Sequence, residues 1–151
     1  MRAEPRDLDI RNYAYVTEIT PRYTDLDTLG HINNVATADL MQETRIHFIH
    51  RILRHSANDF NGDHRVVVVS QLLNYLDEIH YPTTLKVGVA VYAVGNTSFT
   101  LSQLLLQADE PAAWCRCVMV RSENHVAKPI AEDIKKVLKQ HLLGNLGERA
   151  M

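Results

Sequence analysis

The pattern of apolar and polar residues along this chain changes period twice. From residue 13 to 23, apolar and β-branched residues alternate with polar ones, which predicts a β-strand. From residue 34 to 53, apolar positions recur every three or four residues, which predicts a long helix with one apolar side. Strand patterns return from 65 to 121, and a short second helix is expected from 131 to 143. The apolar side of the long helix contains Ala38, Met41, Phe48, Ile49, Ile52 and Leu53, and Arg45 falls among them with a side chain expected to reach past it.

The region after the long helix predicts four consecutive strands. The first, 65–81, is apolar on both faces, and the next two, 83–94 and 97–107, alternate clearly. The last is expected at 112–121. Glycine, asparagine and proline residues mark the turns between them, which makes the strands antiparallel. One strand, one long helix and four antiparallel strands indicate an α+β architecture, in which the sheet curls around the helix to cover its apolar side.

A single domain with two flanking segments is expected. Residues 1–12 form a charged lead-in that is expected to be loose, the domain itself spans 13–130, and 131–151 contribute a C-terminal helix and a flexible tail. The polar segment 56–64 is expected to be a loop. At 151 residues the chain is long enough to bury a core of its own.

Composition and charge exclude several classes of function. Hydrophobic residues make up 46% of the chain and charged residues 23%, and the net charge is −2, as in ordinary globular proteins. Because no long basic run occurs, nucleic acid is not expected as a partner. No apolar stretch is long enough for a membrane span, and the charged N-terminus lacks the apolar core of a signal peptide, which predicts a cytoplasmic protein. Cys115 and Cys117 are predicted to remain free thiols, without a structural zinc site.

The densest group of reactive side chains lies between the first strand and the long helix. From Asp25 to Asn34 the chain carries two carboxylates, a glycine, a histidine and two asparagines. The helix that follows begins with unpaired backbone N–H groups and a partial positive charge, and Asn33 or Asn34 is suited to be its N-cap. A base, hydrogen-bond donors and a helix start together favour a catalytic site, although Asp, Asn and Gly are also ordinary turn and cap residues.

Several motifs, in their order and spacing, resemble one enzyme family. The run from Asp25 to Asn34 resembles the pattern Asp-x-Asp, two residues, Gly-His-x-Asn-Asn of the hotdog-fold acyl-CoA thioesterases of the 4-hydroxybenzoyl-CoA thioesterase type. The resemblance covers residues 13–130. Its weaker parts are Glu43-Thr44-Arg45 in the long helix, Asn74-Tyr75-Leu76 late in the long strand, the turn Gly95-Asn96-Thr97-Ser98-Phe99, and Lys128-Pro129.

This resemblance implies a hotdog fold and the hydrolysis of acyl-CoA to a free acid and CoA, without a cofactor. It maps the catalytic carboxylate onto Asp27, acting as a general base or as a nucleophile that forms a mixed anhydride. Backbone N–H groups around Gly30 to Asn34 would bind the carbonyl oxygen, and His31 would donate to the thioester or orient Asn34. The implied catalytic residues are Asp27, Gly30, His31 and Asn34, and the implied substrate-binding residues are Asp25, Thr37, Glu43, Ser98 and Lys128.

Simpler structural roles remain open for several of these residues. Asp27 could cap a turn, and Asp25 could only bond N–H groups of the loop. Glu43 could pair with His47 one turn later on the helix. The chain also departs from the family pattern at three positions, where Thr37 replaces a usual Tyr, Glu78 replaces a usual Pro and Asn96 replaces a frequent Arg.

Partners and rival functions also follow from the resemblance. Sites in this family lie between subunits, so a homodimer or homotetramer is expected. The alternatives are a thioesterase that acts on acyl carrier protein and a non-catalytic acyl-CoA-binding module. A calcium loop is not expected, because the twelfth position counted from Asp25 is Ala36 and not a carboxylate. No metal site is expected elsewhere.

Overall fold

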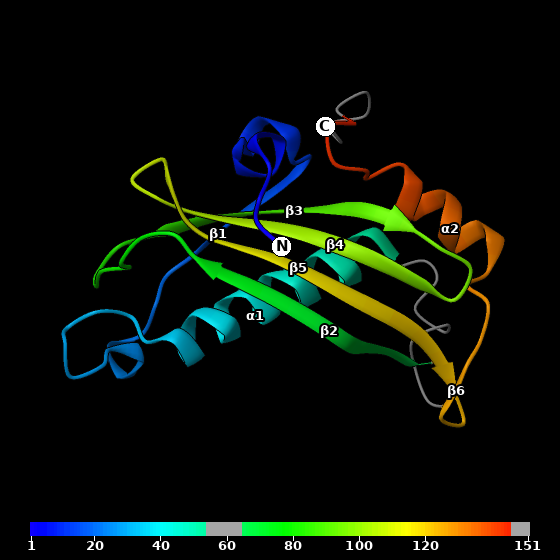
Figure 1. The fold of residues 1–151 in the computed structure, drawn as a ribbon, viewed down its shortest axis with the longest axis horizontal. Coiled ribbons are helices and arrows are strands. Elements are labelled where there is room, and N and C mark those ends of the chain that lie inside the picture. The colour runs from blue at the N-terminus through cyan, green and yellow to red at the C-terminus, as the bar shows by residue number, and fades with distance from the viewer. Residues whose placement is uncertain (54–64, 146–151) are drawn as a thin grey trace.

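A 20-residue helix, α1 (Asn34–Leu53), lies along one face of a curled antiparallel sheet (Figure 1). The computed structural model describes residues 1–53 and 65–145. Five strands follow one another across the sheet in the order β1-β3-β4-β5-β2, and a short sixth strand pairs with β5. Every pair is antiparallel. The strands are β1 (Tyr15–Ile19), β2 (Arg65–Tyr75), β3 (Leu85–Val94), β4 (Ser98–Gln107), β5 (Glu110–Glu123) and β6 (Val126–Ala127), and a second helix, α2, spans Glu132–Lys139.

The main core lies between α1 and the inner face of the sheet, as the period of the apolar residues predicted. Met41 and Phe48 on α1 are fully buried and belong to one cluster with Val89 and Leu101 of the sheet. The bounds of α1 agree with the helix expected at 34–53. This arrangement confirms the predicted α+β hotdog architecture with about five strands around a central helix.

The first and last expected elements are shorter than the sequence pattern suggested. The strand expected at 13–23 covers only Tyr15–Ile19, and the chain then forms a 3-10 turn at Tyr23–Asp25. The second helix ends at Lys139, because residues beyond it bond to β3, where Leu143 N–H donates to the Val91 carbonyl. The expected loop at 56–64 and the last residues of the expected flexible tail, 146–151, lie outside the described residues.

The N-terminal segment, expected to be loose, is instead packed on the outer face of the sheet (Figure 1). It forms 3-10 turns at Pro5–Leu8 and Ile10–Asn12. Between them and the sheet, Asp7 is completely buried and pairs with Arg116 at 3.1 Å. The Tyr13 hydroxyl donates to the Asp7 carbonyl at 2.7 Å, and burial raises the pKa of Tyr13 well above its ordinary value, so the donor keeps its proton. A buried ion pair therefore holds a segment that looks merely charged in sequence.

Strand β2 differs most from its prediction. It ends at Tyr75 and not at residue 81, because the N–H groups of Leu76 and Asp77 both turn to one acceptor, the Ala112 carbonyl. It is also an edge strand, and three successive valines on it, Val67, Val68 and Val69, are exposed among the described residues, while Val66 and Leu73 pack against the core. Exposed fractions there reach 59% at Val69. An edge strand rich in exposed valines is a surface that favours pairing with another strand.

Both cysteines lie on the inner face of the sheet as free thiols, as predicted. Burial raises the pKa of Cys115 to about 12 and also raises that of Cys117. Since the thiolate is the reactive form, these thiols are chemically quiet core residues.

Candidate active site

The loop between β1 and α1 is held at its base by Asp25. This carboxylate is buried, accepts a hydrogen bond from the Arg22 backbone N–H at 2.7 Å, and pairs with the Arg22 guanidinium at 2.9 Å. The backbone carbonyl of Asp25 accepts hydrogen bonds from both the backbone N–H and the side-chain amide of Asn33. Asp25 therefore bonds to its own loop, which matches the structural alternative for this residue, and it does not line the pocket described below.

Replacing Asp25 with Asn is expected to lower the free energy of unfolding by about 1–3 kcal/mol at pH 7. Burial alone would raise the pKa of Asp25, but the hydrogen bonds from Arg22 outweigh it and hold that pKa below its ordinary value. Such a carboxylate stabilises the fold above its unfolded pKa of about 4, and the stabilisation is lost as the pH falls through the folded pKa. Urea unfolding of both proteins should show a difference at pH 7 that shrinks at pH 3. An equal difference at both pH values would contradict this account.

Asp27 lies at the exposed end of the same loop and is held by only one of its oxygens. Its Oδ1 accepts hydrogen bonds from the backbone N–H groups of Leu29, at 2.9 Å, and His31, at 3.2 Å. Within the described part of the chain, Oδ2 has no hydrogen-bond partner. Gly30 makes this turn possible with a φ of +79°, a conformation that favours glycine, and its N–H donates to the Asp27 carbonyl. The carboxylate is thus oriented and still has one oxygen available.

The start of α1 supplies unpaired backbone donors. Asn33 is the N-cap, since its side-chain oxygen accepts from the Ala36 N–H at 2.7 Å. The N–H groups of Asn34 and Val35 have no partner among the described residues, as expected in the first turn of a helix. This narrows the predicted set of donors, Gly30 to Asn34. The N–H groups of residues 30, 31 and 33 bond within the loop and that of Ile32 donates to the Ile79 carbonyl, so of the predicted set only Asn34 is free, together with Val35 next to it.

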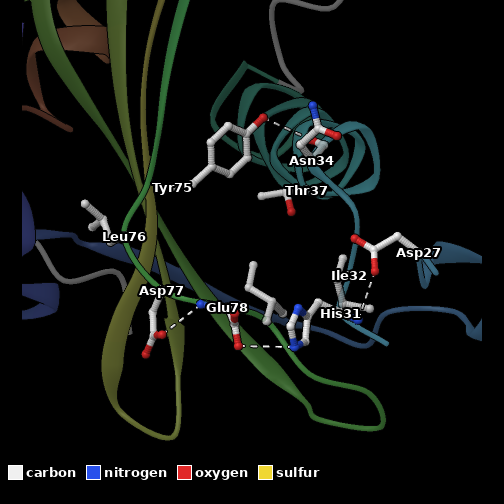
Figure 2. Close-up of a pocket in the computed structure, with 10 residues that line it drawn as sticks. Asp27, His31, Ile32, Asn34, Thr37, Tyr75, Leu76, Asp77 and Glu78 are labelled. Carbon is white, nitrogen blue, oxygen red and sulfur yellow. Dashed lines mark hydrogen bonds and ion pairs between the residues drawn. The ribbon is translucent and has the colours of Figure 1, made fainter. Parts of the chain in front are cut away.

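A pocket of about 440 Å³ opens between this loop, the first turn of α1 and the chain that follows β2 (Figure 2). Asp27 and His31 lie on the loop side, and Tyr75 and Thr37 lie where β2 and α1 approach each other. The Tyr75 hydroxyl donates to the Asn34 carbonyl at 3.2 Å and ties the two walls together. The lining residues include no Lys or Arg and are Asp27, His31, Ile32, Asn34, Thr37, Tyr75, Leu76, Asp77, Glu78 and Ile79.

The side chains of His31 and Glu78 pair across one side of the pocket. Nε2 of His31 lies 3.1 Å from the Glu78 carboxylate, and the two side chains meet in Figure 2. Glu78 is held in place, because its N–H donates to Asp77 and its carbonyl accepts from Gln107. With Nε2 directed at Glu78, the other ring nitrogen of His31 is left for the loop or a ligand.

The structure brings some of the predicted site residues together and leaves others apart. Asp27, His31, Asn34 and Thr37 line the pocket, and Gly30 shapes the turn behind it. Glu43 is exposed and pairs with His47 at 3.1 Å, which matches its simpler alternative. Ser98 and Lys128 lie near the opposite end of the sheet, where Ser98 is in register with Val120 of β5.

Two acidic residues of the pocket were not chosen from the sequence as site residues. Glu78 was noted only as a departure from a usual Pro, and Asp77 was placed inside an expected strand. Their acidic side chains at the end of an apolar run were the available signal, because such a pair seldom continues a strand. Among the described residues, no three His, Cys, Asp or Glu side chains gather where one metal ion could bind all of them.

Comparison with known protein families agrees with this geometry. The model of the thioesterase-like superfamily matches residues 21–138, which include the loop, the pocket and the whole sheet after β1. The chain belongs to the thioesterase-like superfamily. The resemblance of its motifs to thioesterases of the 4-hydroxybenzoyl-CoA type is thereby confirmed at the level of the family.

Individual relatives and solved structures are similar to this chain at modest sequence identity. The uncharacterized protein YsmA of Bacillus subtilis is 27% identical over 121 residues, which cover 80% of each chain. A Thermus thermophilus thioesterase, solved in complex with coenzyme A and Zn, superposes with a TM-score of 0.76 at 26% identity, covering 85% of this chain and 93% of that one. A predicted thioesterase from Bacillus stearothermophilus gives a TM-score of 0.72 at 27% identity, over 85% and 96% of the two chains. Family and fold therefore support thioester hydrolysis.

No helix among the described residues combines the length and the hydropathy needed to cross a bilayer.

Proposed function

We propose that this protein hydrolyses acyl-CoA thioesters to a free acid and CoA, with Asp27 as the reacting carboxylate. The observation that carries the proposal is the state of Asp27, which is fixed through Oδ1 and has Oδ2 free in a pocket. Beside it, the first turn of α1 offers the unpaired N–H groups of Asn34 and Val35. A carboxylate and two such donors are the groups that hydrolysis of a thioester requires.

Two routes use these groups. In one, Oδ2 of Asp27 takes a proton from water as the oxygen attacks the thioester carbon, and the helix N–H groups stabilise the negative charge on the carbonyl oxygen. The C–S bond then breaks and the thiolate of CoA receives a proton. In the other, Oδ2 itself attacks, the thiolate leaves, and water hydrolyses the resulting mixed anhydride. Incorporation of ¹⁸O into Asp27 during a single turnover in H₂¹⁸O would establish the second route, with water attacking the carboxyl carbon of Asp27 in the anhydride.

The activity itself is tested by measuring thiol release from short, long and aromatic acyl-CoAs and from an acyl carrier protein thioester. Hydrolysis of at least one acyl-CoA that is lost in Asp27→Asn supports the proposal. Faster turnover of the carrier protein thioester would favour that rival substrate. Tight binding of acyl-CoA without any release of thiol would instead support a non-catalytic binding module.

His31→Ala is expected to slow this hydrolysis only about tenfold, because one neutral hydrogen bond contributes about 0.5–1.5 kcal/mol. Asp27 and the helix N–H groups would still be in place, so His31 adjusts the reaction without defining it. Steady-state kcat of both proteins on the same acyl-CoA measures the effect. If a folded His31→Ala protein is completely inactive, His31 is an essential acid or base and this ranking is wrong.

We also propose that the working form is at least a homodimer paired through β2. This strand is an exposed edge with apolar side chains, which favours addition of a second strand. Antiparallel pairing with β2 of a second copy would set the Arg65 end of one strand beside the Tyr75 end of the other. Ser98 and Lys128 lie at the Arg65 end of the sheet. Ser98 is in register with Val120 of β5, which is in register with Val67 of β2. The Lys128 N–H donates to the carbonyl of Arg121, which is in register with Val66 of β2. A second copy could therefore bring its Ser98 and Lys128 towards the pocket.

Val69→Lys is expected to shift the protein to a monomer and to lower its activity, because a charge in the middle of an edge strand opposes pairing. Val69 is 59% exposed, so the change should leave the fold of the single chain intact. Light scattering at several protein concentrations, combined with the thiol-release assay, measures both effects. Val16→Lys provides the control, since Val16 is 44% exposed on β1, the opposite edge. A fully active wild-type monomer would overturn the dimer.

A further inference from the structure

Arg45 is a buried cation whose described partners are all neutral. Its side chain rises from the middle of α1 towards the sheet, and the residue is only 2% exposed, which corrects the expectation that it reaches past the apolar side. Nη1 donates to the side-chain oxygens of Gln103, at 3.1 Å, and Gln71, at 3.3 Å. Nε is buried and has no hydrogen-bond partner.

No carboxylate lies within ion-pair distance of Arg45 in the described ranges, 1–53 and 65–145. A buried cation without a counter-charge is costly, and a buried N–H without an acceptor adds to that cost. If two copies pair through β2, the second β2 does not supply the missing counter-charge to Arg45, because Arg65–Tyr75 contains no Asp or Glu. The guanidinium therefore has no anionic partner among the described residues, and an anionic ligand could provide one.

The position of this cation relates it to the pocket. Long helical side chains lean towards the N-terminus, and Gln103, which holds Arg45, also donates to the Met41 carbonyl at 2.7 Å. Met41 is about one helical turn beyond Thr37, which lines the pocket. On the sheet, Gln103 is in register with Cys115 and through it with Leu73, two residues from Tyr75 of the pocket wall. Met41 therefore lies about 6 Å from Thr37 along the helix, and Leu73 lies about 7 Å from Tyr75 along the strand, so the residues that surround Arg45 come directly behind the pocket wall.

We propose that Arg45, with Gln71 and Gln103, binds a carboxylate at the far end of the acyl group. The substrate class would then be CoA monothioesters of short dicarboxylic acids, whose second carboxylate passes beyond the pocket wall to the guanidinium. A carboxylate would satisfy Nε, neutralise the guanidinium and replace the contact from Gln71, whose exposed side chain is free to turn away. This inference deepens the proposed thioester hydrolysis and rests on it.

Matched pairs of substrates test the subsite. Glutaryl-CoA is compared with pentanoyl-CoA, and adipoyl-CoA with hexanoyl-CoA, so that only the terminal carboxylate differs. In the wild-type protein, kcat/KM is expected to favour the carboxylate-bearing member of at least one pair by roughly 10- to 100-fold, the range for a hydrogen bond to a charged group. The preference should disappear in Arg45→Met, which removes the charge and keeps a similar length.

A second variant tests the charge without removing Arg45. Gln71→Glu places a carboxylate beside the guanidinium on an exposed edge residue, so it should cancel the preference while the chain still folds. Gln140→Glu adds the same charge at the exposed end of α2 and should keep the preference. Because each result is a ratio of two substrates on one enzyme, partial unfolding does not imitate it. Persistence of the preference in Arg45→Met or Gln71→Glu would overturn the subsite.

Calorimetric binding of free adipate and hexanoate separates the failure of this inference from the failure of the proposed function. Tighter binding of adipate that depends on Arg45 supports the subsite even if no thioester is hydrolysed. Hydrolysis that depends on Asp27 but shows no preference within either pair overturns the subsite and leaves the proposed activity standing. Equal binding of the two acids by the wild-type protein also overturns it.

Discussion

Asp27→Asn is expected to lower kcat for thioester hydrolysis by about 10²- to 10⁴-fold, with little change in substrate affinity. The substitution is well matched to the structure. An Asn side chain keeps an oxygen to accept from Leu29 and His31, while the free Oδ2 becomes an amide that cannot take a proton or attack. Single-turnover and steady-state rates on the best acyl-CoA measure the effect. The large fall should appear in kcat, because the loop and pocket stay in place.

Asp39→Asn is the matched control for this prediction. Asp39 is an exposed residue on α1 that does not line the pocket. Its replacement by Asn therefore removes the same charge outside the site. Its kcat should stay within about twofold of the wild type, since surface substitutions seldom have larger effects. Wild-type turnover by purified Asp27→Asn would exclude Asp27 as the reacting group and turn attention to Asp77 and Glu78 across the pocket.

Gly30→Val is expected to lower kcat by about 100-fold, because the turn that presents Asp27 depends on a left-handed backbone. Gly30 has a φ of +79°, which a β-branched residue adopts only with strain. No atom lies within 4 Å of the position a Cβ would take, so the cost is in the backbone and not in a collision. Relief of the strain would move the Leu29 and His31 N–H groups that hold Asp27.

Gly30→Asn separates backbone strain from the mere addition of a side chain. Asparagine adopts positive φ more readily than other residues with a Cβ, so this variant should keep most of the activity. Circular dichroism would establish that both variants fold, and kcat would be compared on the same substrate. If folded Gly30→Val matches the wild type, the conformation of this turn has no part in presenting Asp27.

The long helix and the loop before it were predictable because their signals are local. The apolar period from 34 to 53 is contained in one segment, and Asn33 caps the helix with its own side chain three residues before Ala36. Most backbone hydrogen bonds of the motif from Asp25 to Asn34 also join residues a few positions apart, whereas the Ile32 N–H reaches the distant Ile79 carbonyl. The family match over residues 21–138 agrees with what this motif indicated.

The far side of the pocket was not predictable in the same way. Asp77 and Glu78 are a weak sign that the strand ends before residue 81, but the run does not mark Tyr75 as its last strand residue, since the ladder ends where two N–H groups turn to the Ala112 carbonyl of another strand. That ending places Glu78 opposite His31. For Ser98 and Lys128, the motifs indicated a shared site, whereas the topology separates them from the pocket within one chain.

The amino-acid sequence by itself determined the class of fold, the position of α1 and the turn that presents Asp27, because each depends on neighbouring residues and their periodicity. The tertiary structure alone decided which groups from distant segments lie against that turn, inside the core and at the sheet edge. It buried Asp7 against Arg116 and buried Arg45 among amides. It also brought Glu78 to His31 and left β2 at an open edge. These features depend on which strands pair and which groups lose water, and contacts between distant segments set both.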